Sequence, residues 1–149
     1  MDEKTPPFVA NYLLYLLAAS SERASAQFHT HVRKAGLRVP EWRVLACLAD
    51  GDALMITRLA DLALMEQSRM TRIVDQMSSR GLVERVADAG DKRRVRVRLT
   101  EQGQTIADRL VEDAKAQEVR LLSEIADTDA AAIKSVLKSL LTKLAQPDP

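Results

Sequence analysis

Basic side chains gather in the middle third of this 149-residue sequence. Arg69 and Arg72 stand in one short polar segment, and the run Lys92–Arg94 lies between two apolar segments. Guanidinium and ammonium groups bind phosphate, and arginine also reads guanine through two hydrogen bonds. Residues 56–99 carry ten basic and six acidic side chains, whereas the whole chain has a net charge of only +1. These counts exclude a uniformly basic coat and predict a local surface for a polyanion.

The segments around Arg69 and Arg72 predict a helix-turn-helix. Thr57 can cap a short helix, and apolar residues at helical spacing predict a second helix over about 67–80. The N-terminal part of such a second helix fits the major groove of B-DNA, where its side chains reach the edges of base pairs. The candidate DNA contacts are Gln67, Ser68, Arg69, Thr71 and Arg72.

After Gly81 the hydrophobic period changes from 3.6 to 2. In Val95–Leu99 apolar residues alternate with arginines, which is typical of a strand with one buried face. Leu82–Ala87 is the expected antiparallel partner, with basic residues at the tip of the connection. That hairpin can lie along the DNA backbone or enter the minor groove. Arg96 and Arg98 on the strand remain open to two readings, DNA contact or a solvated face.

Long amphipathic segments flank this region. An apolar stripe from Val9 predicts one helix that ends near Gly36, and Pro40 can begin another over about 40–50. Two more helices are expected after Thr100, and the fold class is therefore mainly α with a two-stranded β hairpin. One small unit cannot cover so much apolar surface, which predicts a homodimer.

Three stretches of the chain resemble the MarR family of winged-helix regulators. They are Val39–Leu45, Gln67–Leu82 and Asp91–Thr100, and the third contains the family's wing signature in Asp91, Arg93, Leu99 and Thr100, followed by Gly103. The resemblance covers about residues 10–145. It implies a winged helix-turn-helix with a two-stranded β wing, flanked by N- and C-terminal dimerisation helices.

The resemblance also implies how this chain is organised and what it binds. Residues 1–149 would form a single domain, with the DNA-binding region at 55–99 and the dimerisation helices at 8–36 and 101–145. The homodimer would bind double-stranded DNA at a pseudo-palindromic operator, usually as a repressor. At the wing tip Lys92, Arg93 and Arg94 would contact DNA, and Arg93 would enter the minor groove. Asp91 would stabilise the wing by an ion pair with Arg93.

Many members of the family leave DNA when a small aromatic acid binds between the dimerisation helices and the winged helix. A carboxylate would suit an arginine or a histidine, so a crevice between the first two helices is the expected site. Its candidate residues are Tyr12, Tyr15, Ser20, Arg23, His29 and Trp42. The ligand would be an aromatic acid or its thioester conjugate, and the sequence does not identify it.

Other kinds of site find little support in the sequence. We expect no catalytic residues, because no serine has a nucleophile-elbow setting and no glycine-rich phosphate loop is present. His29 and His31 stand two apart and would point to opposite sides of a helix, so we expect no metal and no cofactor. Cys47 is expected to be a small buried hydrophobe, although a redox role stays open.

The N-terminal residues lack the pattern of a signal peptide, and no apolar run is long enough to span a bilayer. We therefore expect a cytoplasmic protein that does not enter a membrane. The alternative function is a helical dimerisation module that acts through protein partners without specific DNA binding.

Overall fold

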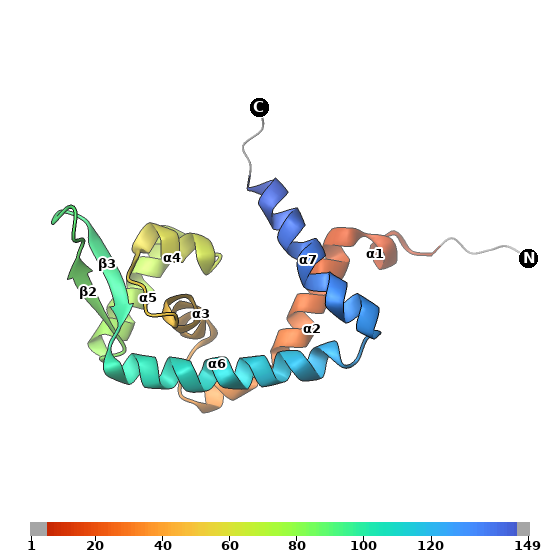
Figure 1. The fold of residues 1–149 in the computed structure, drawn as a ribbon, viewed down its shortest axis with the longest axis horizontal. Helices are drawn as coiled ribbons and strands as arrows, with labels where there is room; N and C mark the ends of the chain where they lie inside the picture. The colour runs from red at the N-terminus through yellow and green to blue at the C-terminus, as the bar shows by residue number, and fades with distance from the viewer. Residues whose placement is uncertain (1–5, 146–149) are drawn as a thin grey trace, which may run out of the picture. The chain divides into compact units, whose positions relative to one another are not determined.

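A computed structural model describes residues 6–145 of the chain, and Figure 1 shows its helices and strands. The elements in chain order are α1 (Phe8–Asn11), α2 (Leu13–Lys34), α3 (Val39–Leu48), β1 (Leu54–Met55), α4 (Ile56–Leu62), α5 (Gln67–Ser79), β2 (Val83–Ala87), β3 (Val95–Leu99), α6 (Glu101–Leu122) and α7 (Asp127–Leu144). The predicted mainly helical fold with a β hairpin is confirmed.

The structure differs from the sequence expectation at three elements. The N-cap residue of α4 is Met55 and not the expected Thr57, which lies inside that helix. The predicted first helix is broken at Tyr12, whose extended backbone (ψ 115°) separates α1 from α2. The expected two-stranded wing is part of a three-stranded antiparallel sheet in the order β1-β3-β2. Leu54 of β1 pairs with Val97 of β3, and Val83 of β2 pairs with Leu99. The hairpin β2–β3 projects beyond the helices of its unit at the left of Figure 1.

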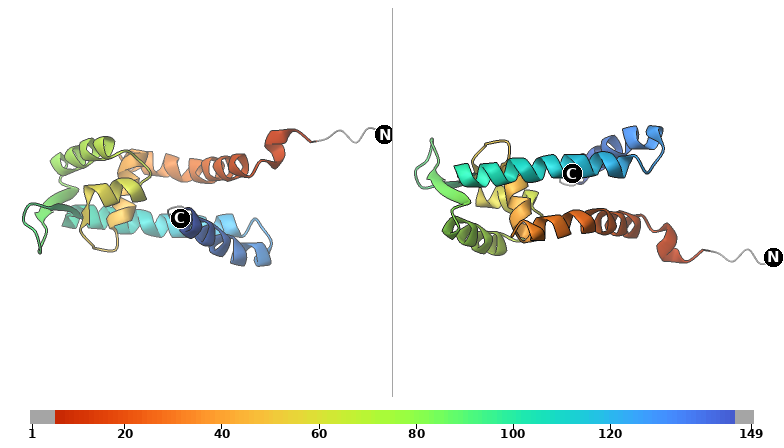
Figure 2. Two further views of the ribbon diagram at one scale, coloured as in Figure 1. Left: turned by 90° about the horizontal axis from the view of Figure 1, so that it is seen from above. Right: turned by 90° about the horizontal axis from the view of Figure 1, so that it is seen from below.

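The chain divides into two compact units, one up to residue 112 and one from residue 113, with the boundary inside α6. The hydrophobic core of the described residues lies in the first unit, where α3, α4, α5 and the sheet pack together. Its buried side chains are Phe28, Val32, Leu37, Val44, Leu45, Leu48, Leu59, Ala60, Ala63, Met70, Ile73, Val74, Met77, Leu82, Val83, Val97, Ala107 and Leu110. Within this unit the C-terminal end of α2 lies beside the first half of α6 (Figure 2).

The junction between the wing and α6 explains the sequence signature around Thr100. The Thr100 hydroxyl donates a hydrogen bond to the Gly81 carbonyl (2.6 Å) and accepts one from the Gly103 amide (3.0 Å). Thr100 therefore caps the N-terminus of α6 and ties it to the start of the wing. A Cβ on Gly103 would lie only 1.9 Å from the Leu82 carbonyl oxygen, so no larger residue fits at this position.

The turn of the helix-turn-helix is a Schellman motif that ends α4. The Leu64 amide donates to the Asp61 carbonyl (3.3 Å), and the Met65 amide donates to the Ala60 carbonyl (3.0 Å). Leu64 takes the left-handed conformation (φ 56°) that this motif requires, and its side chain is 83% exposed. Glycine is the usual residue at such a position, so the turn forms here despite an unfavourable residue.

In the single chain, large apolar side chains remain exposed at both ends of the sequence, in α1 and α2 and in the end of α6 and α7. In α1 and the first turns of α2 they are Phe8, Val9, Tyr12, Leu13, Leu14, Tyr15 and Leu16. In the second unit they are Val119, Leu121, Ile125, Ile133, Val136, Leu137, Leu141 and Leu144. Apolar surface of this extent is typical of an interface and not of a monomer surface.

Candidate nucleic-acid interface

Helix α5 has two distinct faces. Its apolar face packs into the core through Met70, Ile73, Val74 and Met77. Among the residues predicted to contact DNA, Gln67, Ser68, Arg69 and Arg72 are exposed and Thr71 is half-buried. The structure thus brings all five into the first two turns of one helix, just after the turn from α4.

The two arginines of this face are available to a ligand. Neither Arg69 nor Arg72 forms an ion pair within residues 6–145. The Thr71 hydroxyl instead donates to the Gln67 carbonyl within the helix (3.0 Å), so its proton is already engaged. Free guanidinium groups at the N-terminal half of an exposed helix suit base edges and phosphates.

At the wing tip Asp91 organises the loop that carries Lys92, Arg93 and Arg94. One Asp91 oxygen accepts a hydrogen bond from the Arg93 amide (3.0 Å) and lies 3.5 Å from Arg93 Nε. The other oxygen lies 3.8 Å from Arg94 Nε. The side chain of Arg93 is 94% exposed. Asp91 therefore fixes the backbone of Arg93, while most of the guanidinium remains open to solvent.

The wing strands use their remaining charges internally. Arg96 pairs with Asp88 and also donates to the Ala53 carbonyl (3.1 Å), which joins β3 to the segment before β1. Burial would raise the pKa of Asp88, but the hydrogen bond from Arg96, the largest effect, lowers that pKa below its ordinary value. Arg98 pairs with Glu84 across the hairpin (2.7 Å). Both arginines are thus partly exposed and paired within the wing, which favours the reading as a solvated strand face over DNA contact.

Asp75 of α5 forms an ion pair with Arg85 of β2 (2.6 Å). This pair connects α5 to the wing and engages the carboxylate of Asp75 within the protein. Glu66 precedes α5 as its N-cap residue, but its side chain makes no capping hydrogen bond.

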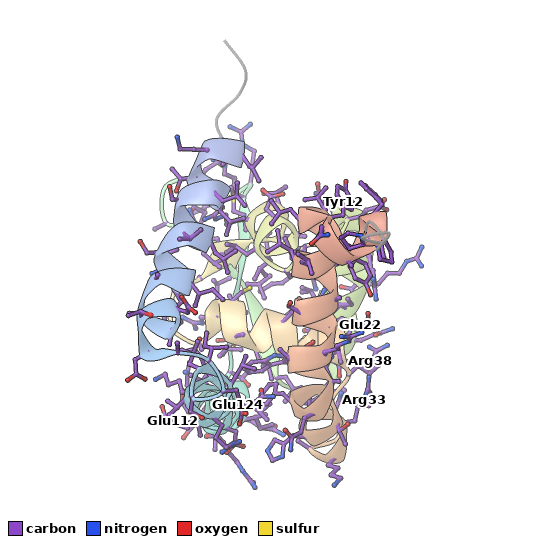
Figure 3. All side chains as sticks on the ribbon, turned by 90° about the vertical axis from the view of Figure 1, so that its right-hand side faces the viewer. Tyr12, Glu22, Arg33, Arg38, Glu112 and Glu124 are labelled. Carbon is purple, nitrogen blue, oxygen red and sulfur yellow. The ribbon has the colours of Figure 1, made fainter. Side chains whose placement is uncertain are left out.

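A surface cavity of about 600 Å³ runs along α2 and reaches Arg43 of α3. It is lined by Ala18, Ser21, Glu22, Ser25, Ala26, His29, Thr30, Arg33 and Arg43. Figure 3 labels Glu22 and Arg33, which mark the middle and the C-terminal end of α2. Burial, with the nearby charges of Arg33 and Arg43, lowers the pKa of His29, so its imidazole is neutral at pH 7.

Of the six residues predicted for a ligand crevice, only His29 lines this cavity. Trp42 is half-buried and packs edge-on against the buried Phe28, with ring centroids 5.1 Å apart, and Tyr12 stacks on Phe8. Tyr15, Ser20 and Arg23 do not line it either. The cationic residues that line the cavity are Arg33 and Arg43, and the sequence analysis missed both. They lie on different helices, and no local sequence pattern shows that their side chains line the same cavity.

Burial raises the pKa of the Cys47 thiol and outweighs the charge of Arg58, which acts in the opposite direction. A thiol with a raised pKa is a poor nucleophile at neutral pH, which favours the structural reading of this half-buried cysteine. In residues 6–145 no group of three histidine, cysteine or acidic side chains could hold a metal ion. None of the helices there has the length and apolarity to cross a membrane.

The chain is similar to known transcriptional regulators in both sequence and structure. Residues 37–95 match the profile of the MarR family. The chain is similar to a MarR family transcriptional regulator from Silicibacter pomeroyi DSS-3, with 70% identity, a TM-score of 0.84, and coverage of 93% of this chain and 98% of that one. It is 26% identical to the organic hydroperoxide resistance transcriptional regulator of Bacillus subtilis over 91% of each chain.

The chain is also similar to the solved structure of NadR in complex with 4-hydroxyphenylacetate, an aromatic acid. The two are 25% identical, with a TM-score of 0.75 and coverage of 89% of this chain and 91% of that one. The similarity in each case extends over the helix-turn-helix, the wing and the flanking helices, since it covers most of both chains.

Proposed function

The chain belongs to the MarR family and is a DNA-binding transcriptional regulator, and on this premise we propose that it acts as a homodimeric repressor at a pseudo-palindromic operator. The observation that carries the proposal is that one compact unit contains both an exposed face of α5 with arginines free of ion pairs and an exposed cationic wing tip. A helical module that acts only through protein partners would not require these two cationic surfaces together.

We propose that the two copies associate through the exposed apolar faces of the flanking helices. Members of the family act as dimers, and a second copy of the chain offers the same faces for burial. Two-fold symmetry then presents the two α5 helices to major grooves about one helical turn apart. The operator should therefore contain inverted half-sites centred about 10 bp apart.

Within each half-site α5 would supply specificity. Arg69 and Arg72 are proposed to reach base edges, because their guanidinium groups are exposed and free of ion pairs. Gln67, Ser68 and Thr71 would complete the same surface. Loss of one such base contact typically costs about 1–3 kcal/mol and relaxes the preference at one position.

Arg93→Ala should weaken binding to operator and to unrelated DNA alike. At the wing tip Arg93 would meet phosphate or a narrow minor groove, where charge dominates over sequence. The slope of log affinity against log salt concentration should fall by about 2, one contact for each protomer. The measurement is a salt titration on a duplex selected from a random pool by the unmodified protein and on its scrambled version.

Arg98→Ala is the matched control for this titration. It removes the same charge from the same hairpin, but Arg98 is already paired with Glu84, so its loss should change the slope less. A slope unchanged by Arg93→Ala, or a loss confined to the selected duplex, contradicts phosphate binding by the wing tip.

A small aromatic acid or its thioester conjugate is the effector class that we propose. Support comes from a relative solved with 4-hydroxyphenylacetate and from the cavity on α2, where Arg33 and Arg43 can pair with a carboxylate. Such a ligand weakens DNA binding only to the extent that it binds the DNA-incompetent state more tightly. Phenolic acids that raise the melting temperature should therefore also weaken the complex in a gel shift, and a panel that does neither contradicts the proposal.

A further inference from the structure

Among the described residues Glu41, in the first turn of α3, is the one charged side chain that is buried, with 1% of its surface exposed. Its two carboxylate oxygens are fully engaged. Oε2 accepts a hydrogen bond from the Arg38 amide (2.8 Å), and Oε1 accepts from the guanidinium groups of Arg38 (3.3 Å) and Arg80 (3.0 Å). A buried carboxylate is tolerated only with partners of this kind.

These partners keep Glu41 ionised. Burial alone would raise the pKa of Glu41, but the hydrogen bonds from Arg38 and the charge of Arg80 outweigh it and lower the pKa below its ordinary value. The anion is therefore present at neutral pH and holds both guanidinium groups in place.

Arg80 connects three elements with one side chain. It is the C-cap residue of α5, and its Nη1 donates to Glu41 at the N-terminus of α3. Its Nη2 donates to the carbonyl of Gly36 (3.1 Å), in the turn that leaves α2 with a positive φ of 79°. The C-terminal end of the recognition helix is thus tied to the corner where α2 turns into α3.

A second contact reinforces this connection one turn earlier on α5. Arg38, labelled in Figure 3 beside the lower part of α2, donates a hydrogen bond from its guanidinium to the side-chain oxygen of Gln76. Arg38 and Arg80 therefore both bind the carboxylate of Glu41. Arg80 ends α5, and Arg38 contacts α5 through Gln76.

We propose that Arg80 is a positioning residue for DNA recognition, which fixes the angle at which α5 presents Arg69 and Arg72 by tying its C-terminal end to Glu41 and the Gly36 carbonyl. The proposal rests on DNA recognition by α5, as described above. It assigns to Arg80 an effect on affinity without any contact to DNA.

The other contacts of α5 cannot fix this angle as well. The apolar face of the helix packs through contacts that have no preferred direction. The Asp75–Arg85 pair joins α5 to the wing, but both side chains are substantially exposed and the pair is weakened by solvent and salt. Hydrogen bonds from one planar guanidinium to a buried carboxylate and a carbonyl are directional and set the orientation.

Arg80→Lys tests the proposal without changing the charge. Lysine can satisfy one acceptor but lacks the fork that reaches Glu41 and Gly36 together. Affinity for a duplex selected from a random pool by the unmodified protein should fall about tenfold or more, as after the loss of a base contact. Affinity for the scrambled duplex should change less than about twofold, because the number of cations is unchanged.

Two further variants separate positioning from other roles. Arg98→Lys, the control, alters an exposed wing pair with the same chemistry and should leave the ratio of the two affinities unchanged. Glu41→Gln should lower the ratio like Arg80→Lys, and the double variant should lose little more than the worse single one, since both break one connection. Far-UV circular dichroism at the assay temperature confirms that each variant is folded.

An unchanged ratio in folded Arg80→Lys overturns the inference, and so does an equal loss on both duplexes, which would indicate phosphate contact or general destabilisation. If the unmodified protein selects no sequence at all, the proposed function fails instead. Amide hydrogen exchange then still tests the connection, because Arg80→Lys should speed exchange in α5 relative to α3. Equal exchange rates in the two proteins overturn the inference independently of DNA.

Discussion

Gly103→Ala should lower the free energy of unfolding by about 1–3 kcal/mol, in the range of an overpacked core position. The new Cβ would lie 1.9 Å from the Leu82 carbonyl oxygen, which is backbone and cannot rotate away. Either α6 moves from the start of the wing or the cap formed by Thr100 opens. Alanine is otherwise the better helix former by about 1 kcal/mol, so intrinsic propensity alone predicts the opposite sign.

Urea denaturation followed by circular dichroism measures this change. Gly90→Ala is the matched control in the wing loop, because its Cβ would approach only the end of the Asp88 side chain at an ordinary 3.6 Å. The control should stay within about 0.5 kcal/mol of the unmodified protein. If Gly103→Ala is as stable as Gly90→Ala, the close approach of α6 to Leu82 does not exist in solution.

The double variant Leu137→Asp/Leu141→Asp should abolish the dimer and, with it, measurable binding to the operator. Both leucines lie on the apolar stripe of α7, where they are 37% and 66% exposed in the single chain. In the proposed dimer each substitution would bury a carboxylate without a partner, a cost of several kcal/mol for each ion and four such ions in the assembly. Sedimentation and a gel shift measure the two effects.

Ser135→Asp/Ser139→Asp adds the same charges with the same spacing on the same helix, but at polar, exposed positions. That control should remain dimeric and bind DNA. A folded monomer of the unmodified chain at micromolar concentration, or a dimeric Leu137→Asp/Leu141→Asp protein, contradicts a dimer interface that includes this face of α7.

Local sequence patterns predicted most of the elements because each has its own period. Alternation in Val95–Leu99 predicted the hairpin, and helical spacing predicted α5 with its buried Met70 and Met77. The strand β1 left no such signal. It has two residues, and its pairing partner Val97 lies more than forty residues later in the chain.

The break at Tyr12 was also missed, because the apolar spacing continues through it and neither glycine nor proline stands there. Glu41 is a similar case. In the sequence it is one carboxylate in a short helix, and its burial depends on Arg38 close by and on Arg80, which comes from a different part of the chain. The sequence shows where the arginines and lysines stand. It does not show which of them form ion pairs within the folded protein and which remain free for DNA.

The left-handed Leu64 has a consequence for how freely this turn can change during evolution or design. A leucine in that conformation costs roughly 1–2 kcal/mol, yet the turn keeps the hydrogen bonds of its motif. Its shape is therefore held by the helices on either side and not by the residue that occupies it. Residue 64 can vary, and the stability of the domain with it, while the path of the chain into the recognition helix stays the same.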